Sequence, residues 1–203
     1  MLRSLLVLLL VLLSCASVQA AAPTTIGIGQ LHQVHSAVLS EDLGYRVYLP
    51  ASYRWAQNRR YPVLFLIDGE SRFNHTATSV EVLASVGDIP EMIVIGIDSL
   101  QRTRDFTPTR WAAINGGGGA EKFRRFLSTE LIPTVEKEFR SSGYRILSGH
   151  SLGGLFALYC LSAEPGLFQA YLAIAPNLEW DTNVAARLLQ QTFAANRTIK
   201  AFA

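Results

Sequence analysis

Apolar segments spaced along the chain predict the strands of a β-sheet. The first two predicted strands, residues 31–39 and 45–49, form a hairpin whose turn is predicted at residues 41–44. Residues 63–67 and 90–98 are almost continuously apolar, which is typical of strands that are covered on both faces. Further apolar segments predict strands at 146–147, 168–175 and 200–203.

Helical patterns lie between these strands. An amphipathic pattern predicts a helix over residues 120–138 with a kink at Pro133, and shorter patterns predict helices over 76–85 and 181–191. A strand, a helix and a strand in this order form the βαβ unit of a parallel sheet. The sequence therefore predicts an α/β fold with a mostly parallel central sheet.

A long polar segment, residues 99–119, interrupts this alternation. A loop of more than about 15 residues in a compact domain is usually either functional or disordered. Its glycines, residues 116–119, follow no strand and precede no lysine, so they do not have the pattern of a phosphate-binding loop. We interpret them as a flexible hinge.

The strongest chemical signal lies at residues 149–153, where a short apolar strand leads directly into an apolar helix. The Gly-x-Ser-x-Gly spacing around Ser151 is that of a nucleophile elbow, and strand, turn and helix are the setting that this motif requires. The glycines at both ends admit a strained turn, and Gly154 allows the helix to pack close to the strand. This pattern predicts an exposed Ser151 hydroxyl and a Leu152 N–H directed at any oxyanion formed there. The alternative is an ordinary turn serine.

The first residues have the pattern of a secretory signal peptide. Arg3 precedes an apolar stretch too short to span a bilayer, and small residues before Ala20 offer a cleavage site. We therefore predict a signal peptide over 1–20, a single domain over 21–203, and a secreted or periplasmic location without stable membrane insertion after cleavage. An N-terminal membrane anchor is the alternative. Cys15 fits a lipobox poorly, so we do not predict a lipoprotein.

Composition narrows the possible functions. With 49% hydrophobic and 17% charged residues, the chain is globular and not disordered. A formal net charge of +2 gives no argument for nucleic acid as a partner. No metal site and no cofactor are predicted, because His32 and His35 have no carboxylate or cysteine cluster beside them and no nucleotide fingerprint is present. Cys160, on the apolar helix, is expected in the core.

Several of these stretches together carry a family resemblance. They are residues 45–50, 63–70, 89–97, 102–109 and 149–154. In this combination the chain resembles the putative esterase family of α/β-hydrolases, which includes esterase D and the enterochelin esterases. The Arg-Thr-Arg-Asp-Phe-Thr-Pro loop that begins at Arg102 is a more specific marker than the elbow itself. The resemblance covers nearly the whole chain after the leader and implies the α/β-hydrolase fold.

The resemblance also implies roles for individual residues. Ser151 is similar to the family's nucleophile, and the Leu152 N–H matches one donor of the oxyanion hole. The second donor is expected from the Glu70 N–H, with Gly69 as the close alternative. Arg104 and Asp105 are candidates for the substrate-binding loop near the catalytic mouth. A small-molecule carboxylic ester is the substrate that the resemblance implies.

The chain departs from the α/β-hydrolase pattern after Ser151. In that pattern an acid and then a histidine follow the nucleophile, but no histidine follows Ser151 here. His150 adjoins Ser151 on a tight turn, so we expect it to point elsewhere. We interpret the chain as a truncated esterase that lacks the last strands and the C-terminal helix, with weak or no turnover. A natural short form, a non-catalytic binding module and an acyltransferase remain as alternatives.

Overall fold

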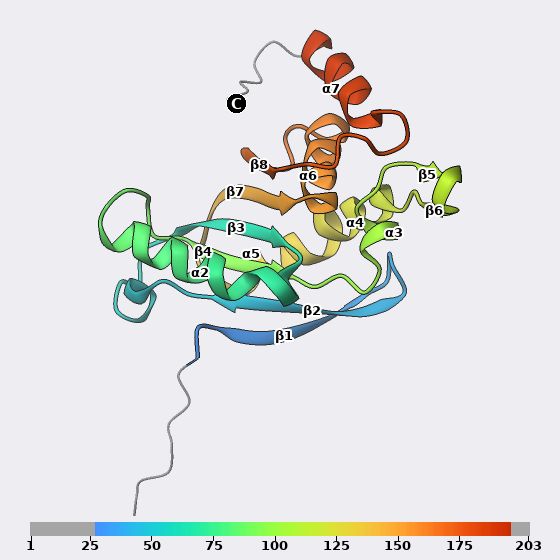
Figure 1. Cartoon of the computed structure of the whole chain (residues 1–203). Coiled ribbons are helices and arrows are strands. Elements are labelled where there is room, and N and C mark those ends of the chain that lie inside the picture. Colours follow the sequence, from blue (N-terminus) through green and yellow to red (C-terminus); the bar gives the residue numbers. More distant parts are fainter. Residues whose placement is uncertain (1–26, 196–203) are drawn as a thin grey trace, which may run out of the picture.

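A computed structural model describes residues 27–195 of the protein, and these form one six-stranded sheet with helices on both faces (Figure 1). The strand order is β1-β2-β4-β3-β7-β8. Strands β4, β3, β7 and β8 run parallel to one another, whereas β1 and β2 are antiparallel additions at one edge. The predicted α/β fold with a mostly parallel sheet is confirmed.

The elements follow one another in a strand–helix alternation. The strands of the main sheet are β1 (Gln30–Ser36), β2 (Glu41–Tyr48), β3 (Tyr61–Ile67), β4 (Ile93–Ile97), β7 (Ser141–His150) and β8 (Ala170–Ile174). The helices are η1 (Ala51–Arg54), α2 (Gly69–Ser85), α3 (Arg102–Asp105), η2 (Ala112–Ile114), α4 (Ala120–Phe126), η3 (Leu127–Leu131), α5 (Ile132–Glu138), α6 (Leu152–Ala163) and α7 (Val184–Ala195). A small second sheet pairs β5 (Arg110–Trp111) with β6 (Gly116–Gly117).

The N-terminal hairpin is confirmed, but its turn lies earlier than predicted. Residues 41–44 belong to β2, where Glu41 and Asp42 pair with the end of β1. The turn is formed by residues 37–40 and is closed by a 2.8 Å hydrogen bond from the Ser40 N–H to the Ser36 carbonyl. Ser40 adopts a positive φ of 59°. Polar residues at the start of a strand resemble turn residues, which is why the sequence pattern misplaced this boundary.

The βαβ unit of β3, α2 and β4 is present, and its helix begins at Gly69 instead of the predicted residue 76. Phe73, Ala77 and Val80 are buried on α2 at helical spacing, so the apolar face starts before the segment that the pattern identified. Asp68, with a φ of 63°, forms the turn from β3 into the helix. As a consequence the first turn of α2 lies at the carboxyl end of β3.

The predicted helix over 120–138 is continuous but changes its winding. A π-helical segment, η3, separates α4 from α5 and ends just before Pro133. Proline lacks an N–H and crowds the preceding turn, so it is compatible with such a local change of winding. The expected irregularity at Pro133 therefore takes the form of a π-helical turn.

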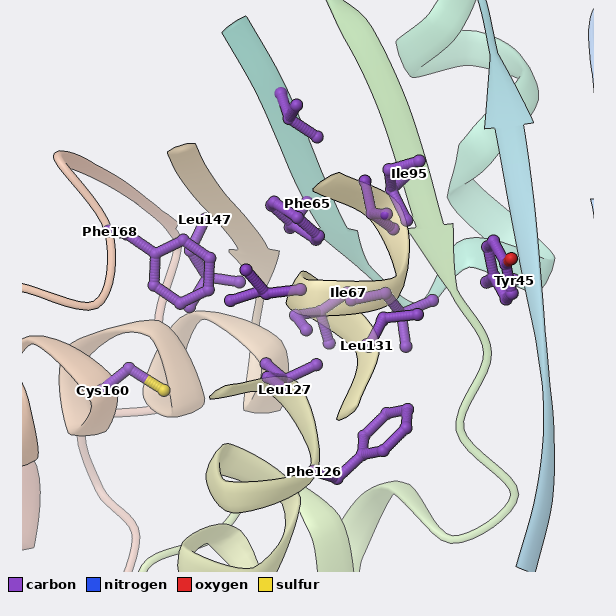
Figure 2. Packing of buried hydrophobic residues seen from close by; sticks show 14 of the residues in the cluster. Tyr45, Phe65, Ile67, Ile95, Phe126, Leu127, Leu131, Leu147, Cys160 and Phe168 are labelled. Carbon is purple, nitrogen blue, oxygen red and sulfur yellow. The ribbon is translucent and has the colours of Figure 1, made fainter. Parts of the chain in front are cut away.

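Side chains of β3 alternate between two apolar layers. Val63, Phe65 and Ile67 pack with residues of α4, η3, α5 and α6, whereas Leu64 and Leu66 pack with Phe73 and other residues of α2. Figure 2 shows the first layer, in which Phe65 and Ile67 face the side chains of the helices. Both faces of the central strands are thus covered, as their continuous apolar sequence predicted.

Cys160 lies in this first layer and is fully buried, as expected for a small core residue. Within residues 27–195, no helix is both long enough and apolar enough to cross a lipid bilayer. The predicted signal peptide and the predicted strand at 200–203 lie outside the residues that the structure describes.

Candidate active site

Ser151 occupies a sharp turn between β7 and α6. Its backbone has φ 57° and ψ −114°, a combination that lies outside the allowed regions for residues with a side chain. Strand β7 ends at His150 and helix α6 begins at Leu152, so the turn consists of a single residue. Ser151 is half-buried and is not sealed inside the core. This is the strand, turn and helix of a nucleophile elbow.

Glycines make the turn sterically possible. A Cβ atom on Gly149 would lie 2.1 Å from the Gly153 carbonyl oxygen, which no side chain can do. A Cβ atom on Gly154 would lie 3.0 Å from Pro176 Cα, so α6 is packed closely against the segment after β8. The sequence pattern predicted the lack of room at Gly149, but it placed the close contact of Gly154 on the strand before the turn and not on the segment after β8.

Hydrogen bonds from the neighbouring chain hold the Ser151 backbone in place. The Ser151 N–H donates to the Ile174 carbonyl at 3.1 Å, and the Ser151 carbonyl accepts from the Asn177 N–H at 3.0 Å. The same carbonyl also accepts from the Leu155 N–H at 2.9 Å. The strained residue is therefore fixed from β8 on one side and from α6 on the other, as persistent backbone strain requires.

Two helix N-termini meet at this edge of the sheet. Helices α2 and α6 start directly after β3 and β7, and these strands are parallel neighbours that end on the same side (Figure 1). The N–H groups in the first turn of a helix have no partner within the helix, and the helix dipole makes this end attractive to negative charge. Leu152 is the first residue of α6, and Gly69 and Glu70 are the first two of α2.

The start of α2 is close to β4 because residue 69 is a glycine. A Cβ atom there would lie 2.4 Å from the Gly96 carbonyl carbon. The N–H groups of Ser71 and Arg72 donate to the Asp68 carbonyl at 3.2 and 3.0 Å. The two amides ahead of them, those of Gly69 and Glu70, precede these first bonds and belong to the N–H groups at a helix start that have no partner within the helix. The Glu70 side chain is exposed, as a solvated carboxylate on a turn would be.

An ion pair between a buried carboxylate and a partly exposed guanidinium lies beside the start of α2. The Asp68 carboxylate is buried and receives hydrogen bonds from Arg102, from Nε to Oδ1 and from Nη2 to Oδ2, the latter at 3.0 Å. This bidentate contact joins the predicted active-site loop to the end of β3. Sequence reasoning assigned no role to either residue, although both lie in the stretches that carried the family resemblance.

Arg104 and Asp105 are engaged with each other and with the hairpin. The Arg104 guanidinium donates to Asp105 Oδ1 at 2.6 Å and to both carboxylate oxygens of Glu41, at 2.5 and 2.9 Å. Asp105 is buried and also accepts from the Ser99 hydroxyl at 2.7 Å. Their hydrogen bonds link the 99–119 segment to β2. The suggested contact of these two residues with substrate stays a prediction.

The glycines of that segment are not the hinge that the sequence suggested. Gly116–Gly117 forms strand β6, and a Cβ atom on Gly117 would lie 2.5 Å from both Thr107 Oγ1 and Trp180 Cζ2. Trp180 in turn donates from Nε1 to the Thr109 carbonyl at 3.1 Å and packs edge-on against Trp111. Glycine is needed here for close packing, and the segment is built against the residues after β8.

None of the four histidines of the sequence hydrogen-bonds to Ser151 within residues 27–195. His150 Nδ1 accepts a hydrogen bond from Arg72 at 2.9 Å, and His35 pairs with Asp42. His32 stacks on the Tyr45 ring, and His75 is exposed on α2. No group of three acidic, histidine or cysteine side chains in the described part of the chain is arranged to hold a metal ion.

Two hollows of the described surface lie away from Ser151. One, of about 690 Å³, is lined by residues 27–30 and 47–55 at the opposite edge of the sheet. The other, of about 330 Å³, lies between α6 and α7 beside Tyr159 and Leu188. Neither is lined by the nucleophile elbow.

The fold and this site define an α/β-hydrolase of the esterase type. The profile of the family described as "Putative esterase" matches residues 36–200, and the chain belongs to this family. It is 36% identical over 142 residues to the ferri-bacillibactin esterase BesA of Bacillus subtilis, and this match covers 60% of the chain and 49% of the relative. It is 29% identical over 133 residues to the siderophore triacetylfusarinine C esterase of Aspergillus fumigatus, with 60% and 46% covered.

Solved structures agree with this assignment. An IroE-like serine hydrolase from Shewanella oneidensis is similar with a TM-score of 0.78 and 34% identity, covering 82% of this chain and 56% of that one. The BES protein from Bacillus cereus shares the fold, with a TM-score of 0.77 at 24% identity, covering 90% and 75%. The chain spans about half the length of the curated relatives described above.

Proposed function

We propose that this protein is a serine hydrolase of carboxylic esters in which Ser151 is the nucleophile. The N–H groups of Leu152 and Glu70, with Gly69 as the alternative to Glu70, form the oxyanion hole in this proposal. The observation that carries it is the backbone of Ser151, a strained single-residue turn fixed between a buried strand and a helix N-terminus. Such strain persists where the surrounding structure enforces it, which is typical of catalytic sites.

The proposed chemistry is acyl transfer through a covalent intermediate. Ser151 Oγ gives its proton to a base and forms a bond to the carbonyl carbon of the ester, and the carbonyl oxygen becomes negatively charged. Amide hydrogens at the starts of α2 and α6 stabilise that charge in place. Collapse of the intermediate expels the alcohol, which takes up the proton, and water then hydrolyses the acyl-enzyme.

The base is not among the side chains that contact Ser151 in the described structure. His150 is bound to Arg72, and the other histidines lie on β1 and on the outer surface of α2. The family resemblance implies an acid and a histidine that complete the triad, and we assign neither role to a residue of this sequence. Because triad members act as a unit, a protein without them has at most weak turnover.

The names of the curated relatives suggest which substrates to test first. The two curated relatives are named as esterases, one of ferri-bacillibactin and one of the siderophore triacetylfusarinine C. We propose a small-molecule ester of this kind for the present protein. Transfer of the acyl group to an alcohol instead of water would use the same residues.

A non-catalytic binding module is the second candidate. The absence of a histidine contact to Ser151 within residues 27–195 favours it. The close packing of Gly149 against Gly153 argues for catalysis, because a surface used only for binding has no need of a strained serine. Hydrolysis or covalent labelling at Ser151 distinguishes the two.

We also propose that the protein is exported. Support comes from the sequence of residues 1–20, with a positive charge, an apolar stretch and small residues near Ala20. Mass spectrometry of the N-terminus of the protein recovered from a secreting host tests this proposal. An intact Met1 in the recovered protein contradicts it.

The catalytic proposal is tested with added imidazole in place of the histidine base. Enterobactin, an ester-linked siderophore, is incubated with the protein, and the hydrolysis products are separated by chromatography. We expect slow hydrolysis that imidazole accelerates and that Ser151→Ala abolishes. Equal product formation by the wild type and the Ser151→Ala variant contradicts the proposal.

A further inference from the structure

The position of the Asp68–Arg102 ion pair in the fold suggests a role beyond the pairing of two charges. Asp68 is 1% exposed, and its carboxylate makes no capping bond to the N–H groups of α2. Its oxygens are directed instead to the Arg102 guanidinium, which comes from the loop after β4. Arg102 also lies over the buried Phe106 ring, 5.9 Å from its centre.

The Asp68 carboxylate also lies beside the nucleophile elbow. A Cβ atom on Gly153 would be 3.5 Å from Asp68 Oδ2, so the carboxylate lies close beside the first turn of α6. In the chain, Asp68 directly precedes Gly69 and Glu70. A buried negative charge therefore lies between the two helix starts whose amides form the proposed oxyanion hole.

An unpaired carboxylate at this place would oppose the reaction. Charges inside a site with a low dielectric interact much more strongly than they do in water, and like charges repel. Further carboxylates are close, since the charge of Glu70 acts on both Arg102 and Asp98. The Arg102 guanidinium is charged at neutral pH, and its hydrogen bond with Asp68 raises its pKa further. The positive charge of Arg102 thus lies against the negative charge of Asp68.

We propose that Arg102 is a positioning residue for the oxyanion hole. Arg102 neutralises and orients the Asp68 carboxylate, so that the amides of α2 and α6 bind the oxyanion without repulsion from the negative charge of Asp68. This inference rests on the proposed function of Ser151. Arg102 acts through Asp68, and its charge is not assigned to the substrate. The consequence is that removing the negative charge of Asp68 makes Arg102 dispensable.

The test measures the rate at which a fluorophosphonate modifies Ser151 in the purified protein with imidazole present. In this reaction the Ser151 oxygen bonds to phosphorus, fluoride leaves, and imidazole takes up the proton. We expect Arg102→Ala to slow the first-order labelling step about 10- to 100-fold, the range expected for an unpaired charge near the reacting oxygen. The double variant Arg102→Ala with Asp68→Asn, which has a neutral side chain of the same shape, should label within about threefold of the wild type.

A purely structural brace gives a different result, because the Asp68→Asn substitution restores none of the hydrogen bonds that are lost with Arg102. Arg102→Ala and the double variant would then be equally slow, and the inference would be overturned. A role in binding the ligand is also distinguishable, because it would raise the probe's half-saturation concentration in both variants. That outcome overturns the inference as well.

Controls keep the two proposals separate. Arg110→Ala removes an exposed arginine of the same segment that contacts Asn115 and leaves Asp68 paired, so its labelling rate should equal that of the wild type. Should Arg102→Ala fail to fold, the double variant alone decides, because slow labelling of that folded protein overturns the inference. If Ser151 of the wild type is labelled but the double variant does not regain the wild-type rate, only this inference is contradicted. If Ser151 of the wild type is not labelled at all, the proposed function is contradicted.

Discussion

Arg72 on α2 donates a hydrogen bond to Nδ1 of His150 at 2.9 Å, so the histidine that precedes Ser151 in the chain is held by the neighbouring helix. Adjacent residues of a tight turn point in different directions, and here the ring has a partner other than the hydroxyl. His150 therefore supports the elbow from the side of α2. It is not in place to take a proton from Ser151.

This relationship predicts the effect of His150→Gln. Glutamine can accept the Arg72 hydrogen bond through its side-chain oxygen, so the elbow should keep its shape. We expect fluorophosphonate labelling of Ser151 to stay within about threefold of the wild-type rate. A loss as large as that of Ser151→Ala would show that His150 is the base after all.

Replacing a glycine of the elbow by alanine should lower the free energy of unfolding, whereas the same replacement at a glycine with open space around it should not. In Gly149→Ala the new methyl group would meet the Gly153 carbonyl at 2.1 Å, and overpacking of this kind costs about 3 kcal/mol of unfolding free energy. Gly166→Ala is the matched control, because nothing lies within 4 Å of its added Cβ. Urea denaturation of both variants measures the difference. Equal midpoints would contradict the packing described for the elbow.

Arg104 is predicted to stabilise the fold of the active-site segment. Arg104→Ala leaves the Asp105 carboxylate, which is 1% exposed, with Ser99 as its remaining side-chain partner. Leaving a buried charge unpaired costs about 3 to 5 kcal/mol, less where solvent reaches the pair. Thermal unfolding followed by circular dichroism measures the loss, with Arg110→Ala as the control. An unchanged midpoint would favour a role in substrate contact alone.

Stability should fall at alkaline pH through the half-buried Tyr159. Burial raises the pKa of Tyr159 to about 12, and its hydrogen bond to Glu121 acts in the same direction. Between the ordinary tyrosine value of 10.0 and about 12, the unfolded chain loses this proton while the native protein retains it. The free energy of unfolding therefore decreases over this range.

Tyr159→Phe has no proton to lose, so the same range should show a smaller decrease in stability for this variant. Urea denaturation at a series of pH values compares it with the wild type. An unchanged slope above about pH 10 would show that the Tyr159 hydroxyl does not contribute.

Much of the fold and the central feature of the site could be predicted from sequence. Continuous apolar runs predicted the buried strands β3 and β4, and the spacing of glycines around Ser151 predicted the turn. The start of α2 was missed because Phe73 is the only residue with an apolar side chain between positions 69 and 75. The hairpin turn was misplaced for the similar reason that Glu41 and Asp42 are polar strand residues.

Contacts between distant segments could not be predicted in the same way. The Asp68–Arg102 pair joins residues 34 positions apart, and the Glu41–Arg104 pair joins residues 63 apart. Periodicity describes one element at a time, so it gives no information on which charged side chains meet at the edge of the sheet. The glycines at 116–119 misled for a related reason, since the side chain that packs against Gly117 comes from Trp180.

The proposed function depends most on the reactivity of the Ser151 hydroxyl. The direct measurement is peptide mapping by mass spectrometry after treatment of the folded protein with a fluorophosphonate in the presence of imidazole. We expect a single adduct on Ser151, formed faster than on any other serine and absent after heat denaturation before treatment. A folded protein in which Ser151 stays unmodified, or is modified no faster than the other serines, would contradict it.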